Sequence, residues 1–394
     1  MLVRTLLVSS LSTLMLACTA LGEPAEGERL SRMQASPQWQ DGGFLNQRPA
    51  ESASTWTLLK ASLTQMSPHS RPEAPIAVLK RSRQDFDLAP DSGLRVTWLG
   101  HSNLIVEIDG YRVLIDPIWG ERPSPISWLG PTRWYESPLA LEELPRIDAV
   151  LISHDHYDHL DHQTVLALLE KQIPWVVPLG VGAHLQAWGM DNAHITELDW
   201  WASYRIGDLE LTATPARHFS GRGFDGGDQN GGPTLWAGWS IAGPKHRVYY
   251  SGDTALFDAL TDIGERLGPF DLTLIETGAY NRYWRDVHLG PEQAVRAHQL
   301  VGGKLLLPVH WGLFNLSFHG WTEPVERLLA EAQAQQVAVV IPKPGEMLEP
   351  ALASGPVKAW WPQLPWERAD QSPVISSGTE HLMLSGARQA QQSN

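Results

Sequence analysis

Short runs of apolar residues, bounded by polar or turn-forming residues, recur through the central part of the chain. Such runs are typical of buried strands, and the Asp109-Gly110 pair between two of them is typical of a hairpin turn. The pattern predicts strands at residues 94–99, 104–108, 112–115, 149–152, 175–177, 209–214, 235–241, 247–250, 272–275 and 304–307.

Helical periodicity separates or follows these runs. It predicts helices at residues 162–171, 256–266, 291–300 and 324–335, and a further helix at 56–66 that precedes the first strand. The sequence shows no repeat of fixed period. Strands interleaved with helices favour a layered α/β domain.

The composition changes on both sides of this domain, which we place at residues 91–350. Residues 23–90 are mixed and rich in Pro and Ser, and they predict an extension wrapped on the domain. Residues 351–394 are expected to form a polar C-terminal tail. Within that tail, residues 376–394 have the composition of a loose segment.

Residues 1–22 have the pattern of an export signal: Arg4, an apolar stretch at 6–16, and then small residues. The five residues that end at Cys18 are similar to a bacterial lipoprotein signal, in which the cysteine is acylated. Ordinary secretion with an unmodified Cys18 is the alternative. Both interpretations predict a protein of the bacterial envelope, either periplasmic or an outer-membrane lipoprotein held at the membrane surface by acylated Cys18.

Composition narrows the possible functions. The formal net charge of -14 argues against a non-specific nucleic-acid binder, which needs a basic surface to meet phosphates. The single cysteine excludes an intrachain disulfide and a thiolate-rich metal site. The 18 Trp residues predict core and pocket walls, some of which could face a greasy substrate, and the 15 His residues include a dense cluster.

That cluster reads Ser-His-Asp-His-Tyr-Asp-His at residues 153–159, directly after a predicted strand. Side chains alternate along an extended segment, so His154 and His156 point to the same side, while Asp158 and His159 follow where the loop turns back. One segment can therefore bind two adjacent metals. Crowded imidazoles repel one another when protonated and need partners when buried, so a purely structural role explains the cluster poorly. The segment therefore predicts metal binding at a strand end.

Three later residues occupy equivalent positions. His218, Asp253 and His310 each follow a predicted apolar strand within a few residues. In α/β sheets such strand ends converge on one edge, where sites form. Each residue alone could be an ordinary buried His or turn Asp, but the repeated placement favours further metal ligands.

The His-x-His-x-Asp-His motif with downstream His, Asp and His resembles the metallo-β-lactamase fold superfamily, whose members are αββα sandwiches of two mixed sheets with outer helices. That resemblance implies two zinc ions per chain. One zinc would be bound by His154, His156 and His218, and the other by Asp158, His159 and His310, with Asp253 bridging the two. Nitrogen and oxygen ligands also accept Fe or Mn, so the sequence does not determine the identity of the metal.

The resemblance narrows to the N-acylphosphatidylethanolamine-hydrolysing phospholipase D family. The shared motifs are Trp98-Leu99-Gly100-His101, Ile115-Asp116-Pro117-Ile118, Ser127-Trp128-Leu129-Gly130-Pro131, Ile147-Asp148-Ala149-Val150-Leu151-Ile152-Ser153-His154, Glu197-Leu198-Asp199-Trp200-Trp201, Gly278-Ala279-Tyr280, Pro291-Glu292-Gln293-Ala294-Val295 and His310-Trp311-Gly312. The chain departs from the family at Val287, where animal enzymes carry Gln, at Glu276 and Thr277, which replace apolar residues, and in the Gly-rich loop 219–233.

The family resemblance implies a metal-dependent phosphodiesterase that releases phosphatidic acid and an N-acylethanolamine from a membrane phospholipid. Asp253 is expected to bridge the metals and Asp158 to orient the attacking water. His288 and Tyr157 are candidates for phosphate contacts or leaving-group protonation, with packing behind the ligands as the alternative. Another hydrolase on the same fold, such as a lactonase or small phosphodiester hydrolase, and a non-catalytic metal-stabilised envelope binding protein are the competing hypotheses.

Overall fold

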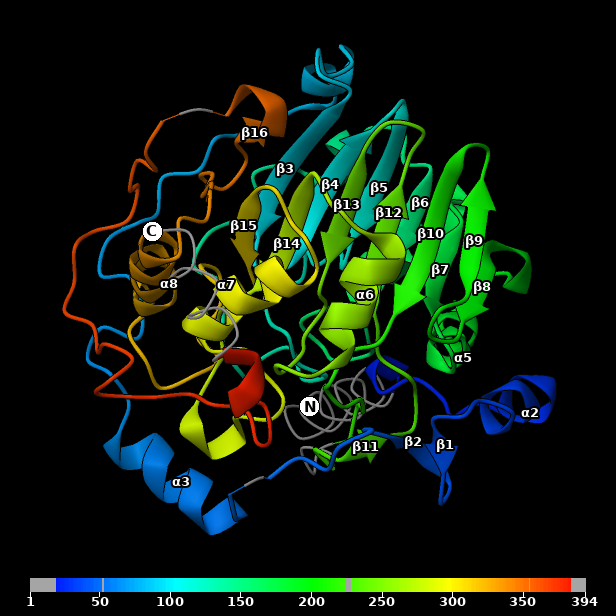
Figure 1. Ribbon diagram of the computed structural model, residues 1–394. Helices are drawn as coiled ribbons and strands as arrows, with labels where there is room; N and C mark the ends of the chain where they lie inside the picture. The colour runs from blue at the N-terminus through cyan, green and yellow to red at the C-terminus, as the bar shows by residue number, and fades with distance from the viewer. Residues whose placement is uncertain (1–18, 52, 224–227, 354, 384–394) are drawn as a thin grey trace, which may run out of the picture.

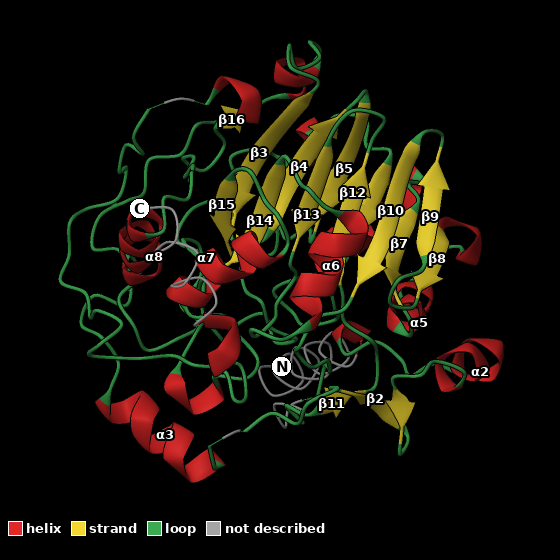
Figure 2. Ribbon diagram, in the orientation of Figure 1, coloured by secondary structure: helices red, strands yellow, loops and turns green. Residues whose placement is uncertain are grey.

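The computed structural model describes residues 19–51, 53–223, 228–353 and 355–383. In this part of the chain two mixed β-sheets lie face to face, and helices cover their outer faces (Figures 1 and 2). The predicted αββα sandwich is thereby confirmed. Most of the predicted export signal, with Cys18, lies outside the described residues.

The larger sheet has seven strands and is antiparallel at one end and parallel at the other. In the order in which they pair, they are β16 (Met347–Leu348), β3 (Leu94–Gly100), β4 (Asn103–Ile108), β5 (Tyr111–Ile115), β6 (Ala149–Leu151), β7 (Trp175–Pro178) and β8 (Ile195–Leu198).

The facing sheet has six strands and is also mixed. Its order is β15 (Leu306–Val309), β14 (Leu272–Glu276), β13 (Arg247–Tyr250), β12 (Gly238–Ala242), β10 (Leu209–Thr214) and β9 (Ser203–Ile206). A small third sheet joins β1 (Trp39–Gln40), β2 (Gly43–Leu45) and β11 (Gly231–Gly232).

The α-helices of the described residues are α2 (Gly27–Gln34), α3 (Thr55–Thr64), α4 (His162–Leu168), α5 (Val181–Ala187), α6 (Ala259–Leu267), α7 (Pro291–Leu300) and α8 (Glu323–Ala334). Short 3-10 turns lie at Arg83–Phe86, Leu141–Glu143, Leu169–Lys171, Asn192–His194, Arg282–Trp284 and Pro350–Leu352. None of the described helices combines the length and the apolar character needed to cross a membrane.

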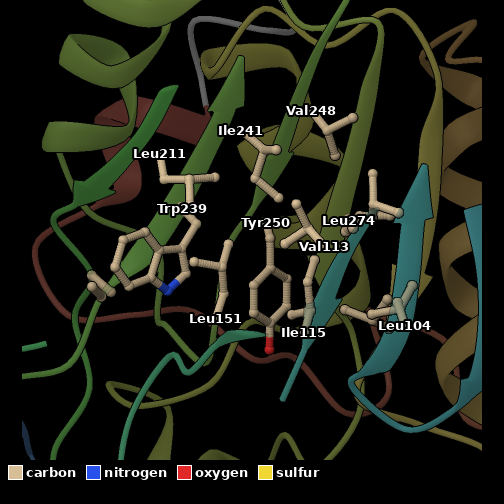
Figure 3. Packing of buried hydrophobic residues seen from close by; sticks show 14 of the residues in the cluster. Leu104, Val113, Ile115, Leu151, Leu211, Trp239, Ile241, Val248, Tyr250 and Leu274 are labelled. Atoms are coloured by element: carbon tan, nitrogen blue, oxygen red, sulfur yellow. The ribbon is translucent and has the colours of Figure 1, made fainter. Parts of the chain in front are cut away.

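The main core fills the space between the two sheets. Figure 3 shows Val113 and Leu151 of the larger sheet packed toward Trp239 and Tyr250 of the smaller one. Apolar area removed from water is the dominant stabilising term, about 25 cal/mol per Å². The Trp239 indole N–H also donates to the Ile152 carbonyl at 3.0 Å, so the sheets are joined by a hydrogen bond where β6 ends.

Two further apolar layers attach the helices. One packs α4 and α5 on the larger sheet, and the other packs α6, α7 and α8 on the smaller sheet. In each layer aliphatic side chains of the helices meet the outward side chains of the strands, which explains why most central strands are buried along their whole length.

The apolar pattern located every strand of the two large sheets except β8, β9 and the two-residue β16. The predicted helix at 291–300 coincides with α7, whereas β12 begins at Gly238 rather than at residue 235. The pattern missed β8 and β9, because both are partly exposed and carry polar residues on one side. It also missed α5, a seven-residue helix that contains Gly182.

The C-terminal segment differs from the loose structure expected for residues 376–394. Ser376 is fully buried and Leu382 is largely buried, and the Ser376 hydroxyl donates to the Arg285 carbonyl at 3.0 Å. Small polar side chains that bond to the backbone can be buried at little cost, which composition alone does not reveal. Residues 384–394 lie outside the described part of the chain.

Candidate metal centre

The structure gathers all the predicted metal-binding residues at one edge of the sandwich. The segment 153–159 follows β6 of the larger sheet, while His218, Asp253 and His310 follow β10, β13 and β15 of the smaller one. Together with His101, Glu276 and His288 they form overlapping groups in which the possible ligand atoms lie within 4.8 Å of one another: His154, His156 and His218; His101, Asp158, His159 and His310; His154, His159 and Asp253; and Asp253, Glu276, His288 and His310.

The first group consists of three imidazoles whose nitrogens converge. His156 Nδ1 lies 2.8 Å from His154 Nε2 and 3.2 Å from His218 Nε2. His218 Nδ1 donates to the Val287 carbonyl at 2.7 Å, so its Nε2 presents a lone pair to the centre. Burial lowers the pKa of both His154 and His218 well below the ordinary value, and neutral imidazoles are the form that binds metals.

The second group is built around two carboxylates. Asp253 Oδ2 lies 3.2 Å from His159 Nε2 and 3.1 Å from His310 Nε2, and Asp158 Oδ2 lies 3.2 Å from the same His310 nitrogen. Asp253 Oδ2 is also 3.8 Å from His154 Nε2. Asp253 therefore stands between the two groups, where the bridging role expected for it is geometrically possible.

The charge balance of the centre favours a cation. Burial raises the pKa of Asp253, but nearby His159 and His310 outweigh it, so the pKa lies well below the ordinary value. Burial lowers the pKa of His310, but Asp253 and Asp158 raise it to about 10. The buried carboxylates thus demand positive charge beside them.

Two buried atoms test whether a metal fits. His159 Nε2 and Asp253 Oδ1 have no hydrogen-bond partner among the described residues. His159 Nδ1 lies 2.7 Å from Asp116 Oδ2, so a neutral His159 that donates there can offer its Nε2 lone pair to a metal. Unsatisfied buried acceptors are costly, and a divalent ion would satisfy both. These His and Asp clusters are able to bind metal.

Residues behind the cluster hold it in place. Asp116 accepts hydrogen bonds from the Ser153 backbone N–H at 2.7 Å and from the Tyr250 hydroxyl, besides that from His159. His101 Nε2 lies 2.9 Å from Asp158 Oδ2. Both residues, which stand in motifs of the family resemblance, thus orient ligands and fix the loop that carries them.

A cavity of about 240 Å³ opens over the centre. Phe219, Trp284 and Leu316 form apolar parts of its wall, and His156, Asp158 and Asp253 lie at its polar floor. Cavities of about 640 and 650 Å³ lie elsewhere, and the described residues that line them include none of the predicted metal ligands. The smaller cavity is therefore the candidate substrate site.

His288 lines this cavity, as a catalytic candidate should. Its Nδ1 donates to Glu276 Oε2 at 2.7 Å, so its Nε2 is the nitrogen left for a ligand. Glu276 is fully buried and also accepts from the backbone N–H groups of Thr254 and Leu289. Sequence reasoning missed Glu276 as a site residue, although it ends an apolar strand as the ligands do.

Tyr157 is not brought to the cavity. Its hydroxyl donates to the Arg222 carbonyl, and the Arg222 guanidinium lies 4.1 Å from the centre of its ring. It lines a different cavity together with Ala20 and His162. Adjacent residues in a loop point in different directions, so sequence proximity to His156 and Asp158 was a poor guide for Tyr157.

Comparisons with known proteins agree with this geometry. The model of the beta-lactamase superfamily domain matches residues 111–311. An uncharacterized protein of Mycobacterium tuberculosis is 47% identical over 87% of this chain and 91% of its own length. The N-acyl-phosphatidylethanolamine-hydrolyzing phospholipase D 1 of Caenorhabditis elegans is 39% identical over 61% of this chain and 70% of its own.

More distant proteins share the fold. A UPF0173 metal-dependent hydrolase of Pyrobaculum aerophilum is 29% identical over 65% of this chain and its entire length. The structure of a metallo hydrolase from Ignicoccus hospitalis superposes with a TM-score of 0.50 at 24% identity, over 65% of this chain and 97% of that one. The chain therefore belongs to the metallo-β-lactamase superfamily and is a metal-dependent hydrolase, with N-acylphosphatidylethanolamine-hydrolysing phospholipase D among its homologues.

Proposed function

We propose that this hydrolase is a phospholipase D-type phosphodiesterase that cleaves N-acylphosphatidylethanolamine or a related phospholipid. The observation that carries the proposal is the 39% identity to the Caenorhabditis elegans enzyme of that name. The cavity supports it, because its polar floor suits a phosphodiester and Phe219, Trp284 and Leu316 suit the adjoining apolar chain.

The reaction adds water across one bond. Water attacks phosphorus, the bond from phosphorus to the ethanolamine oxygen breaks, and that oxygen takes a proton. The products are phosphatidic acid and an N-acylethanolamine. Bound divalent ions supply Lewis-acid chemistry, which polarises substrate oxygens and lowers the pKa of water to about 7.

Two side chains of the cavity have separate roles in this reaction. Asp158, held by His101, orients the attacking water. His288, held by Glu276, faces the cavity with Nε2 and can contact the phosphate or give a proton to the leaving oxygen. Tyr157 has no part in this scheme, because its hydroxyl bonds to the Arg222 carbonyl.

For the metals we propose two Zn²⁺ ions per chain, held by the residues that the family resemblance assigns. The nitrogen-rich group of His154, His156 and His218 suits zinc, and the same donors accept Fe or Mn. Elemental analysis of protein purified from its native host would identify the metal and give the number of ions per chain. A single metal per chain would contradict the proposed pair.

The decisive experiment is a substrate panel. Purified protein is incubated with N-acylphosphatidylethanolamine, phosphatidylcholine and lactones, and the products are identified by mass spectrometry. We expect chelator-sensitive release of phosphatidic acid and N-acylethanolamine. Lactone turnover alone would overturn the lipid assignment, and failure to hydrolyse even bis(p-nitrophenyl) phosphate with metal present would favour a non-catalytic envelope binding protein.

The proposal also covers the location of the protein in the cell. The export pattern at residues 1–22 supports delivery to the bacterial envelope, and Cys18 supports anchoring by acylation. Radiolabelled palmitate should enter the wild-type protein but not Cys18→Ser, and fractionation should find both outside the cytosol. Labelling of neither protein would contradict the anchor, and recovery in the cytosol would contradict export.

A further inference from the structure

Helix α3 exposes a stripe of apolar side chains. Trp56, Leu59 and Leu63 are 75%, 51% and 79% exposed, and Met66, just after the helix, is 42% exposed. The spacing of three and four residues between Trp56, Leu59 and Leu63 places these three on one side of the helix, because each residue advances about 100°. Scattered single apolar residues are ordinary on a surface, but an ordered stripe on one element indicates a function.

The helix is fixed to the protein by its other side and its ends. Ala61 is buried on the opposite face. Ser54 caps the first turn by accepting from the Thr57 N–H, and beyond the last turn the Gln65 amide donates to the Tyr283 hydroxyl at 2.8 Å. The Ser67 N–H donates to the Phe318 carbonyl at 2.7 Å. The stripe is therefore held outward by specific contacts.

These contacts connect α3 to the wall of the metal cavity. Tyr283 is followed by Trp284, which lines the cavity and packs edge-on against Phe318 at 5.3 Å. Figure 1 shows α3 beyond the ends of the strands, at the lower left of the view. The segment that carries Trp284 thus lines the cavity and is hydrogen-bonded to the C-terminal end of α3.

A second anchor point lies beside the metal loop. The Ala20 carbonyl accepts from the Arg222 guanidinium at 2.9 Å, and the same guanidinium donates to the carbonyls of Asp155 and Leu160 in or next to the segment 153–159. The Thr19 carbonyl accepts from the Trp188 indole at 2.7 Å. The first described residues, Thr19 and Ala20, therefore lie beside the metal loop.

We propose that α3 is an interfacial helix that inserts its stripe into a phospholipid bilayer and holds the cavity at the membrane surface; this rests on the proposed lipid substrate. Trp and Leu are among the residues that such helices place on the face that enters the bilayer. Four side chains offer a few hundred Å², less than the about 800 Å² that each partner of a stable dimer buries.

Apolar contact, rather than charge, drives this binding. The protein carries a net charge of -14, and Lys60 is the one basic residue within α3. An acidic protein gains little from anionic lipids, so the helix should bind zwitterionic bilayers, and 0.5 M NaCl should not release it.

The test compares two equally exposed leucines. Leu63 and Leu88 are both 79% exposed, but Leu88 precedes β3, at the edge of the larger sheet opposite to the metal centre. Full-length proteins, all carrying Cys18→Ser to remove the acylation site, are sedimented with phosphatidylcholine/phosphatidylethanolamine vesicles. Leu63→Ser should weaken binding about tenfold and Trp56→Ser/Leu63→Ser about a hundredfold, whereas Leu88→Ser should stay within about twofold.

Two further measurements separate the possible outcomes. Hydrolysis of bis(p-nitrophenyl) phosphate should be the same in all variants, which shows that the metal centre is intact. Equal vesicle binding by Leu63→Ser and Leu88→Ser overturns the proposal, and so does light scattering that shows the double variant dissociating a dimer while its vesicle binding is unchanged. Failure to cleave N-acylphosphatidylethanolamine in detergent micelles contradicts the proposed function instead, whatever the vesicles show.

Discussion

At the scale of single residues, the centre depends on imidazoles and carboxylates that have no adequate partners except one another. His156 is the clearest case, since its Nδ1 faces the nitrogens of both His154 and His218. Lone pairs that converge in this way repel unless a cation lies between them. Removing one of these side chains should therefore affect metal binding first.

We predict that His156→Ala and Asp253→Ala each reduce hydrolysis by more than about a hundredfold and lower the bound metal, because an incomplete set of ligands loses geometry and charge neutralisation. Activity and elemental analysis measure both effects. His194→Ala, in a surface turn, is the matched control and should change neither quantity. Full metal content in both variants would contradict the ligand assignment.

Glu276 gives a subtler prediction, because it acts through His288. Its carboxylate accepts from His288 Nδ1, whereas the amide of Glu276→Gln would donate to that nitrogen and reverse the tautomer. We expect kcat to fall about 10- to 100-fold with KM and metal content unchanged. A loss of bound metal would show instead that Glu276 belongs to the metal ligands.

At the scale of elements, the C-terminal segment supports the loop that carries His288. The Ser377 hydroxyl donates to Asp286 at 2.8 Å, and Ser376 bonds to Arg285 and Gln293. Truncation after Ile375 should therefore cost about 3–5 kcal/mol of unfolding free energy, from lost hydrogen bonds and the lost burial of Leu382. Denaturant midpoints of the truncated and full-length chains measure this, and equal midpoints would contradict this role.

The elements also show what the sequence could and could not predict. Apolar runs predicted the central strands because both faces of those strands are buried, and the polar residue after each run predicted the site. The edge strand β9 alternates exposed and half-buried residues, so it lacked that signal. The directions of Tyr157 and His288 depend on contacts with distant residues, which no local pattern contains.

At the scale of the whole molecule, the centre joins the two sheets. The ligands at 153–159 come from the larger sheet, and His218, Asp253 and His310 come from the smaller one. Tyr250 adds a protein contact at the same edge, since its hydroxyl donates to Asp116 across the sandwich. A cation bound between these groups would therefore resist separation of the sheets as well as activate substrate.

Removing the metal should accordingly lower stability and not activity alone. Binding to the folded state stabilises it by about 4 kcal/mol when free metal is a thousand times its dissociation constant, which corresponds to a fall in Tm of about 5–10 °C on removal. Calorimetry before and after dialysis against chelator measures this, and added Zn²⁺ should restore the Tm. His156→Ala should show a much smaller shift, because its site is incomplete. An unchanged Tm in wild-type protein proven free of metal would mean that the sandwich edge is held by Tyr250, Trp239 and the apolar core alone.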